Sequence, residues 1–282
     1  MNKNSEWTEI IKPKHSWFDL RFRELYDYKD LIYILARKDI VMVYKQTVLG
    51  FVWFLIPPII NSLTFYFIFG YVAPISTDKT PPFIFYLCNT IAWGYFADCL
   101  TKTANTFQVN SSIFGKVYFP RLIPPISVAI SSLAKFGVQL AMFLCFYVFF
   151  SIISPDVTIT YYIFWVPFLI LLMALLGLGF GIIVSSLTTK YRDLSFMINI
   201  GVQLLMYASP VIYPLSSAPE KWRWVLQLNP MTTIIEIFRI GFLGQGSFSL
   251  HALIYTVCVV FGVLITGVII YNRVEKTFMD TV

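Results

Sequence analysis

The chain has 282 residues, of which 57% are hydrophobic and only 13% are charged, and its formal net charge is +6. A soluble domain of this size would carry roughly 25% charged residues. A single soluble core cannot hold so much apolar side chain, so the composition excludes an ordinary soluble protein and predicts an integral membrane protein. The cysteines and histidines lie singly along the chain, which predicts no metal site.

Residues 1–47 form a polar arm that holds nine Lys and Arg residues. Apolar residues recur at helical spacing from Trp17 to Tyr28 and again from Leu31 to Met42. The pattern fits amphipathic helices in the membrane interface, or an ordinary cytoplasmic cap. The arm lacks the apolar core of a signal peptide, so the first span is expected to serve as its own insertion signal.

Six apolar stretches follow the arm, and each is long enough to cross a bilayer at about 1.5 Å per residue. The first contains Pro57 and Pro58, which are expected to kink it. The sequence therefore predicts an all-α membrane protein with six transmembrane helices. The expected spans are 48–72, 83–104, 122–150, 162–187, 195–212 and 249–271, followed by a tail at 272–282.

The orientation follows from the Lys and Arg residues that flank the spans. If the arm is cytoplasmic, the inner segments hold 16 basic residues and the outer segments hold 4. This asymmetry is a strong positive-inside signal, which places both ends of the chain in the cytoplasm. The inner segments are 1–47, 102–121, 188–194 and 272–282, and the outer ones are 73–82, 151–161 and 213–248.

The outer segment 213–248 is too polar to span the membrane and too apolar to be a free loop. An amphipathic stretch runs from Met231 to Leu243, directly after Asn229-Pro230. One or two short re-entrant helices are expected here, dipping into the outer leaflet, with a plain surface hairpin as the alternative. Non-helical backbone at that depth is tolerated only where protein or a water-filled cavity satisfies it.

Two charged residues lie well inside the expected spans, away from the span ends: Asp98 in the second and Lys135 in the third. Charges in such helices are costly and are functional candidates by default. Either the two side chains pair, or each faces a water-filled cavity. Two isolated charges do not make a proton-relay chain, which disfavours an ion-driven carrier.

Motifs for catalysis or nucleotide binding are absent from the sequence. Its one Gly-Lys pair, Gly115-Lys116, is not a phosphate-binding loop, because the position five before that glycine is Asn110. There is no Gly-x-Ser-x-Gly elbow and no His-Glu-x-x-His. The sequence therefore predicts no active site in this chain.

A block at the start of the first span carries a family resemblance. Residues 37–40 read Arg-Lys-Asp-Ile and residues 44–50 read Tyr-Lys-Gln-Thr-Val-Leu-Gly, leading into Trp53 and Pro57. This block closely resembles the opening of permease subunits of ABC exporters for O-antigen, capsular and teichoic-acid polysaccharides. Shorter blocks resemble that family in the same order: Phe119-Pro120-Arg121, Tyr191-Arg192-Asp193-Leu194, Ser209-Pro210-Val211 and Leu228-Asn229-Pro230-Met231.

The resemblance covers the chain from about residue 30 onward and implies a homodimer with two copies of a separate ATP-binding subunit. ATP and Mg²⁺ would bind to that partner, so this chain would be a transport subunit, not an enzyme, and would hold no cofactor. The implied cargo is a lipid-linked polysaccharide, O-antigen-like, moved outward through a continuous channel in the bacterial inner (plasma) membrane. Membrane lipid is an expected partner, and nucleic acid is not.

The aromatic content of 18% suits a sugar channel, because aromatic faces match the C–H faces of sugar rings. Weak contacts at many points would let a polymer move in steps. Packing or lipid contact is the alternative for each residue. The expected channel residues are Tyr44, Trp53, Phe54, Phe65, Tyr207 and Tyr213.

Two further sets of residues are assigned on the cytoplasmic side. Arg37, Lys38 and Lys45 are expected to bind the lipid pyrophosphate or to form a gate, with ordinary anchoring in anionic lipid as the alternative. The segments 108–121 and 190–193 are expected to contact the ATPase and to pass its motion to the spans. The coupling candidates are Ser111, Lys116, Phe119, Arg121, Tyr191, Arg192 and Asp193.

Two other functions compete with polysaccharide export. A similar permease could export a drug or a small lipid, although the aromatic excess and the block at 44–50 favour glycan. A membrane enzyme that acts on lipid-linked sugars would need convergent acidic residues or histidines near the membrane face. The intracellular loops offer little beyond Asp193, which disfavours such an enzyme.

Overall fold

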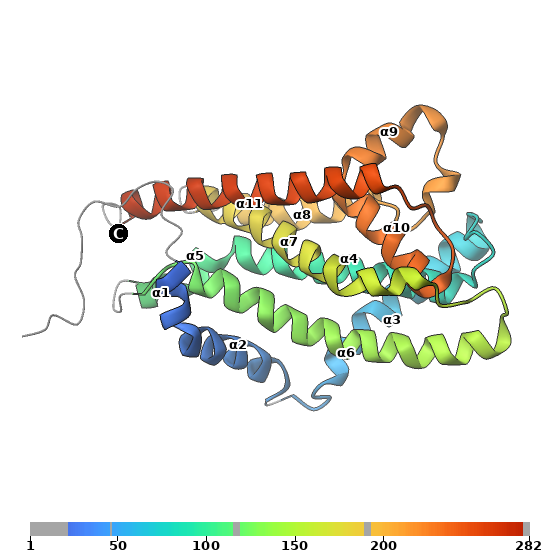
Figure 1. The fold of residues 1–282 in the computed structure, drawn as a ribbon. Helices are drawn as coiled ribbons and strands as arrows, with labels where there is room; N and C mark the ends of the chain where they lie inside the picture. The colour runs from blue at the N-terminus through green and yellow to red at the C-terminus, as the bar shows by residue number, and fades with distance from the viewer. Residues whose placement is uncertain (1–21, 46, 115–118, 189–192, 279–282) are drawn as a thin grey trace, which may run out of the picture.

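The computed structural model describes residues 22–45, 47–114, 119–188 and 193–278, and every regular element within these ranges is a helix (Figure 1). Five helical segments are long and apolar enough to cross a membrane, and Leu194–Tyr207 is a shorter apolar helix. Together they account for the six predicted spans and confirm an all-α, multi-pass membrane protein. The five long segments are Val52–Val72, Pro82–Ala104, Ile123–Ile153, Tyr161–Thr188 and Leu250–Arg273.

The helices form one elongated bundle (Figure 1). The arm helices α1 and α2, the short helix α5 and the C-terminal end of α11 lie at one end of it, and α9 lies at the other. This arrangement agrees with the predicted topology, in which the arm, the segment after the second span and the C-terminal tail lie on the same side of the membrane. The elements are α1 (Phe22–Asp27), α2 (Lys29–Tyr44), α3 (Val52–Phe67) with η1 (Ile68–Val72), α4 (Pro82–Ala104), α5 (Thr106–Phe114), α6 (Ile123–Ile153), η2 (Tyr161–Trp165), α7 (Val166–Thr188), α8 (Leu194–Tyr207), η3 (Leu215–Ser217), α9 (Glu220–Leu228), α10 (Pro230–Leu243) and α11 (Leu250–Phe278).

Helix α4 forms the centre of the bundle. It is apolar on every side, and a helix of that kind is stable only when other helices surround it. It packs against α3, α6, α7, α8 and α10, and most of its residues are buried. The spans α3, α6, α7 and α8 therefore pack on α4, whereas α11 packs on α7 and α10.

Glycines bring α7 close to both of its neighbours. A Cβ atom at Gly181 would lie 2.5 Å from the Cβ of Thr103 on α4, and one at Gly177 would lie 2.6 Å from the Cβ of Cys99. On the α11 side, a Cβ at Gly267 would lie 2.9 Å from the Gly179 carbonyl oxygen. Small residues at these crossings let the backbones approach, which is how spans associate where lipid removes the hydrophobic driving force.

Pro57 and Pro58 lie inside α3, and a side chain on the neighbouring helix α6 replaces a hydrogen bond that the prolines remove. Pro57 and Pro58 have no N–H, so the carbonyl of Phe54 cannot accept a backbone hydrogen bond from position i+3 or i+4. Gln139 on α6 supplies the missing donor, with its Nε2 atom 2.8 Å from the Phe54 oxygen. Both residues are buried, so this bond fixes α3 on α6 where water is excluded.

Helix α8 is shorter than expected and ends at Tyr207 instead of continuing to 212. The reason is Pro210, which lacks an N–H and disfavours helical backbone in the residue before it. Two asparagines donate hydrogen bonds to polar groups of the buried turn that follows α8. Asn89 donates to the Val211 carbonyl at 3.0 Å, and Asn229 donates to the Ser209 hydroxyl at 2.8 Å.

The outer segment forms two helices, α9 and α10, as expected, and not a plain hairpin. Asn229 caps α10, because its side chain accepts a hydrogen bond from the Met231 N–H at 3.0 Å. Gly244 ends the helix in the left-handed conformation, with φ at +72°. Every residue of α10 is buried, whereas α9 has none that is. Helix α10 is therefore a structural part of the bundle, and α9 lies on its surface.

Candidate functional site

The predicted channel aromatics divide into exposed and packed side chains. Trp53 on α3 and Tyr207 on α8 are about half exposed, at 48% and 47%. Phe54 is only 6% exposed, and Phe65 packs against Tyr86 on α4 with ring centroids 6.0 Å apart. In one chain, therefore, Phe54 is buried and Phe65 is partly buried against the core.

The two remaining aromatic candidates are Tyr213 and Tyr44. Tyr213 is half-buried and its hydroxyl donates to the Tyr207 carbonyl at 3.1 Å, so the structure brings these two tyrosines together. The backbone of Tyr44 ends α2, but its side chain lies outside the described residues. A channel role for all six aromatic residues stays a prediction.

A cavity of about 550 Å³ lies between α2, α4, α5 and α6, at the end of the bundle that is predicted to be cytoplasmic. Lys38 and Asp39 on α2, Lys102 in the last turn of α4 and Asn105 just after that helix are among its lining residues. Burial raises the pKa of the Asp39 carboxyl, while the charges of Lys38 and Lys102 act in the opposite direction. The cavity thus combines two cations with a half-buried carboxyl group, and it can hold an anionic headgroup.

Of the three predicted mouth residues, Lys38 alone lines this cavity. Arg37 and Lys45 are exposed and lie outside its lining. Lys102 is an addition that the sequence analysis counted only as a positive charge in a loop. Its position in the last turn of α4, facing the arm, could not be read from the sequence without knowing where α2 packs.

A packed joint ties α5 and the loop after it to the end of α11. Phe107 stacks on Tyr271 with ring centroids 4.7 Å apart, and the Tyr271 hydroxyl donates to the Arg121 carbonyl at 2.6 Å. Phe119 and Arg121 are buried in the same region. In addition, the Thr188 hydroxyl at the end of α7 donates to the Ala104 carbonyl at the end of α4, just before α5. Motion applied to α5 would therefore reach several spans.

The other predicted coupling residues are placed in part. The backbone of Ser111 belongs to α5, and Asp193 is exposed immediately before α8. Lys116, Tyr191 and Arg192 lie outside the described residues. An ATPase contact at these positions stays a prediction.

The intramembrane charges Asp98 and Lys135 form a pair. The Lys135 Nζ atom lies 2.6 Å from the Asp98 Oδ2 atom, and both side chains are 24% exposed. Of the two alternatives, the structure therefore shows pairing between α4 and α6. The ion pair makes each charge tolerable in the membrane and links these two spans.

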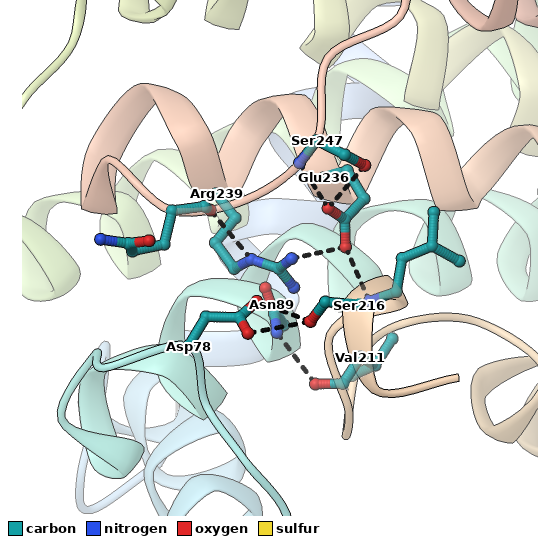
Figure 2. Close-up of polar contacts among 9 residues, drawn as sticks. Asp78, Asn89, Val211, Ser216, Glu236, Arg239 and Ser247 are labelled. Carbon is teal, nitrogen blue, oxygen red and sulfur yellow. Dashed lines mark hydrogen bonds and ion pairs between the residues drawn. The ribbon is translucent and has the colours of Figure 1, made fainter. Parts of the chain in front are cut away.

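A second charged pair is buried more deeply, and the sequence analysis missed it (Figure 2). Glu236 and Arg239 on α10 are 2% and 0% exposed and form an ion pair with each other. Arg239 also lies over the Phe85 ring, 5.0 Å from its centroid. A signal was present, since these are the two charged residues, at spacing i and i+3, in an otherwise uncharged stretch from Pro230 to Leu243.

Glu236 connects α10 to two separate segments. Its Oε1 atom accepts a hydrogen bond from the Leu215 N–H at 3.2 Å, and its Oε2 atom accepts one from the Ser247 N–H at 2.9 Å. Arg239 donates through Nε to the Gln245 carbonyl at 3.2 Å. These contacts hold the segments before α9 and after α10 on α10, so the pair organises the end of the bundle where α9 lies.

Comparison with known proteins connects these features to transport. A family model described as ABC-2 type transporter matches residues 30–243. The O-antigen export system permease protein RfbA of Klebsiella pneumoniae is 25% identical over 252 residues, covering 89% of this chain and 94% of that protein. The protein of the same name from Myxococcus xanthus is 25% identical over 219 residues, covering 77% and 82%. The polysialic acid transport protein KpsM of Escherichia coli is 21% identical over 238 residues, covering 83% and 89%.

The family match runs from the first turn of α2 to the last residue of α10. It therefore includes nearly all of α2, the cavity beside it, both ion pairs and the first five spans. It covers well over half of the chain. The chain belongs to the ABC-2 type transporter family.

Proposed function

We propose that this chain is the membrane-spanning half of an ATP-driven exporter that moves a lipid-linked polysaccharide outward across the bacterial inner membrane. The observation that carries the proposal is the similarity to permeases named for O-antigen and polysialic acid transport, which covers most of both chains. The working unit is a homodimer bound to two copies of a cytoplasmic ATP-binding subunit. ATP and Mg²⁺ bind to that subunit, and both ends of this chain lie in the cytoplasm.

The exposed faces of α3 and α8 support a second copy of the chain. Only Ile198 of the α8 residues is buried, while Ile200 and Leu204 are 62% and 63% exposed. On α3, Leu63 and Phe67 are 49% and 64% exposed. Two copies that meet through these faces surround one path with α3 and α8 of each, and Trp53 and Tyr207 then have free faces beside it.

The cytoplasmic cavity is the proposed entry point for the lipid-linked end of the cargo. Lys38 and Lys102 donate to the pyrophosphate oxygens, and Arg37 and Lys45 outside the cavity draw the headgroup toward it. ATP-driven motion of the partner then acts on α5. The joint of Phe107 and Tyr271 carries that motion to α11.

The assembly is tested by affinity purification of the full chain in mild detergent, followed by native mass spectrometry. The proposal predicts two copies of the chain bound to two copies of an ATPase that contains a phosphate-binding loop. A chain that purifies alone, or with glycosyltransferases and no ATPase, would overturn it.

The aromatic path is tested by combining Trp53→Ala with Tyr207→Ala in the assembled exporter. Export should fall steeply while ATP hydrolysis continues, because only the contacts with sugar are removed. Phe261→Ala is the matched control, since Phe261 is equally exposed, at 48%, and lies on α11, which is not one of the two helices assigned to the path. Normal export by the double variant would contradict the aromatic path.

A further inference from the structure

A second cavity, of about 580 Å³, lies at the outer end of the bundle. Its walls come from the loop that holds Asp78 and Lys79, from α9 with Arg223 and Gln227, and from the turn after α10 with Gln245. Its volume lies within the usual range for small-ligand sites. It is at the opposite end from α2 and α5, where an exported polymer would leave the membrane (Figure 1).

The carboxylates of this cavity are already occupied by protein donors (Figure 2). Both Asp78 oxygens accept from the Ser216 hydroxyl, at 2.8 and 3.0 Å. Glu236 accepts from Leu215 and Ser247, and Arg239 behind it neutralises its charge. Neither carboxylate therefore needs a ligand as its donor.

The free groups of the cavity are cations and amides. Arg223 uses one terminal nitrogen to donate to the Ser216 and Ala218 carbonyls, and its buried Nε has no partner. Within the described part of the chain, the side chains of Lys79, Gln227 and Gln245 make no hydrogen bond or ion pair. Arg239 lies behind the lining and balances the charge of Glu236, so Lys79 and Arg223 face one remaining carboxylate, Asp78, and the site has surplus positive charge.

We propose that this cavity binds an acidic sugar, one that carries a carboxylate, as part of the passing polysaccharide. Lys79 and the guanidinium group of Arg223, which both line the cavity, donate charge-assisted hydrogen bonds to the carboxylate. The amides of Gln227 and Gln245 both donate and accept, so they match ring hydroxyls, which a simple inorganic anion does not offer. This inference rests on the proposed function, and it adds a cargo class and an outer binding site to it.

The test is saturation-transfer difference NMR on the purified full chain in detergent, with trigalacturonic acid as the probe and maltotriose as its uncharged counterpart. Trigalacturonic acid should bind saturably, and maltotriose should bind at least about tenfold more weakly. Inorganic phosphate at equal concentration should not displace the probe. Absent binding, equal binding of maltotriose, or displacement by phosphate would each overturn the proposal.

Variants of the lining residues test whether the probe binds in this cavity. Lys79→Gln breaks no contact within the described residues and should weaken binding of trigalacturonic acid about tenfold, and adding Arg223→Gln should weaken it further. Lys221→Gln is the matched control, because it removes the same charge from α9 at a position outside the cavity lining. Binding unchanged by Lys79→Gln, or weakened equally by Lys221→Gln, would overturn the assignment. None of these readouts depends on the ATPase, so this proposal and the exporter assembly fail independently.

Discussion

The bond between Gln139 and the Phe54 carbonyl yields a sharp prediction about how the first span is held. Gln139→Leu keeps a similar side-chain volume and removes the donor at 2.8 Å. Pro57 and Pro58 occupy the two positions that would otherwise donate, so the Phe54 oxygen is left without a partner. The substitution should destabilise the chain and loosen α3 from α6.

The size of the effect follows from the burial of both partners, which are 5% and 6% exposed. An unsatisfied buried acceptor costs about 1–3 kcal/mol. The apolar Leu offsets part of this cost in a buried site, so the net loss for Gln139→Leu should be about 1–2 kcal/mol. At about 2–4 °C per kcal/mol for a chain near this size, the melting temperature should fall by several degrees.

The decisive assay is a double-mutant cycle with Pro58→Ala, followed by thermal unfolding in detergent. Alanine restores an N–H at position 58, which can donate to the Phe54 carbonyl within the helix. Gln139→Leu should then cost much less in the Pro58→Ala background than in the native one. An equal cost in both backgrounds would refute the role of Gln139 as the substitute donor.

Three further stability predictions concern the packing and the ion pairs. Gly181→Ala should lower stability by about 1–3 kcal/mol through its clash with α4, whereas Gly262→Ala, which meets nothing within 4 Å, should have little effect on the same melting curve. Arg239→Leu should cost about 3–5 kcal/mol because it strands the Glu236 carboxylate, and adding Glu236→Leu should recover part of the loss; no recovery would show that the charge is not the cause. Asp98→Asn should lower stability because the lysine paired with it loses its counter-charge; an unchanged melting temperature would contradict the pairing.

The architecture could be predicted because it depends on long apolar stretches and on the distribution of Lys and Arg. Each of the six expected spans corresponds to a helix, and Asn229-Pro230 marks the start of α10 as the sequence analysis placed it. The early end of α8 has a local cause in Pro210. It could have been predicted from the restriction that proline places on the preceding residue.

The tertiary contacts of the site could not be predicted in the same way. Phe54 and Trp53 are neighbours in sequence and both are aromatic, yet one is buried and the other is half exposed, because the packing of α4 and α6 decides which face of α3 is covered. Gln139 and Lys102 likewise gain their roles from helices far away in the sequence. The pairing of Asp98 with Lys135 was one of two alternatives until the α4–α6 contact placed them together.

The most direct test of polysaccharide export is to deplete this chain in its native host and to measure where the lipid-linked polysaccharide accumulates. Export by this chain predicts that surface polysaccharide falls while full-length, lipid-linked polymer accumulates on the cytoplasmic side, and that the full chain supplied in trans restores export. Unchanged surface polysaccharide, or loss of the polymer from both sides, would contradict export and would favour a drug or small-lipid permease or a role in synthesis.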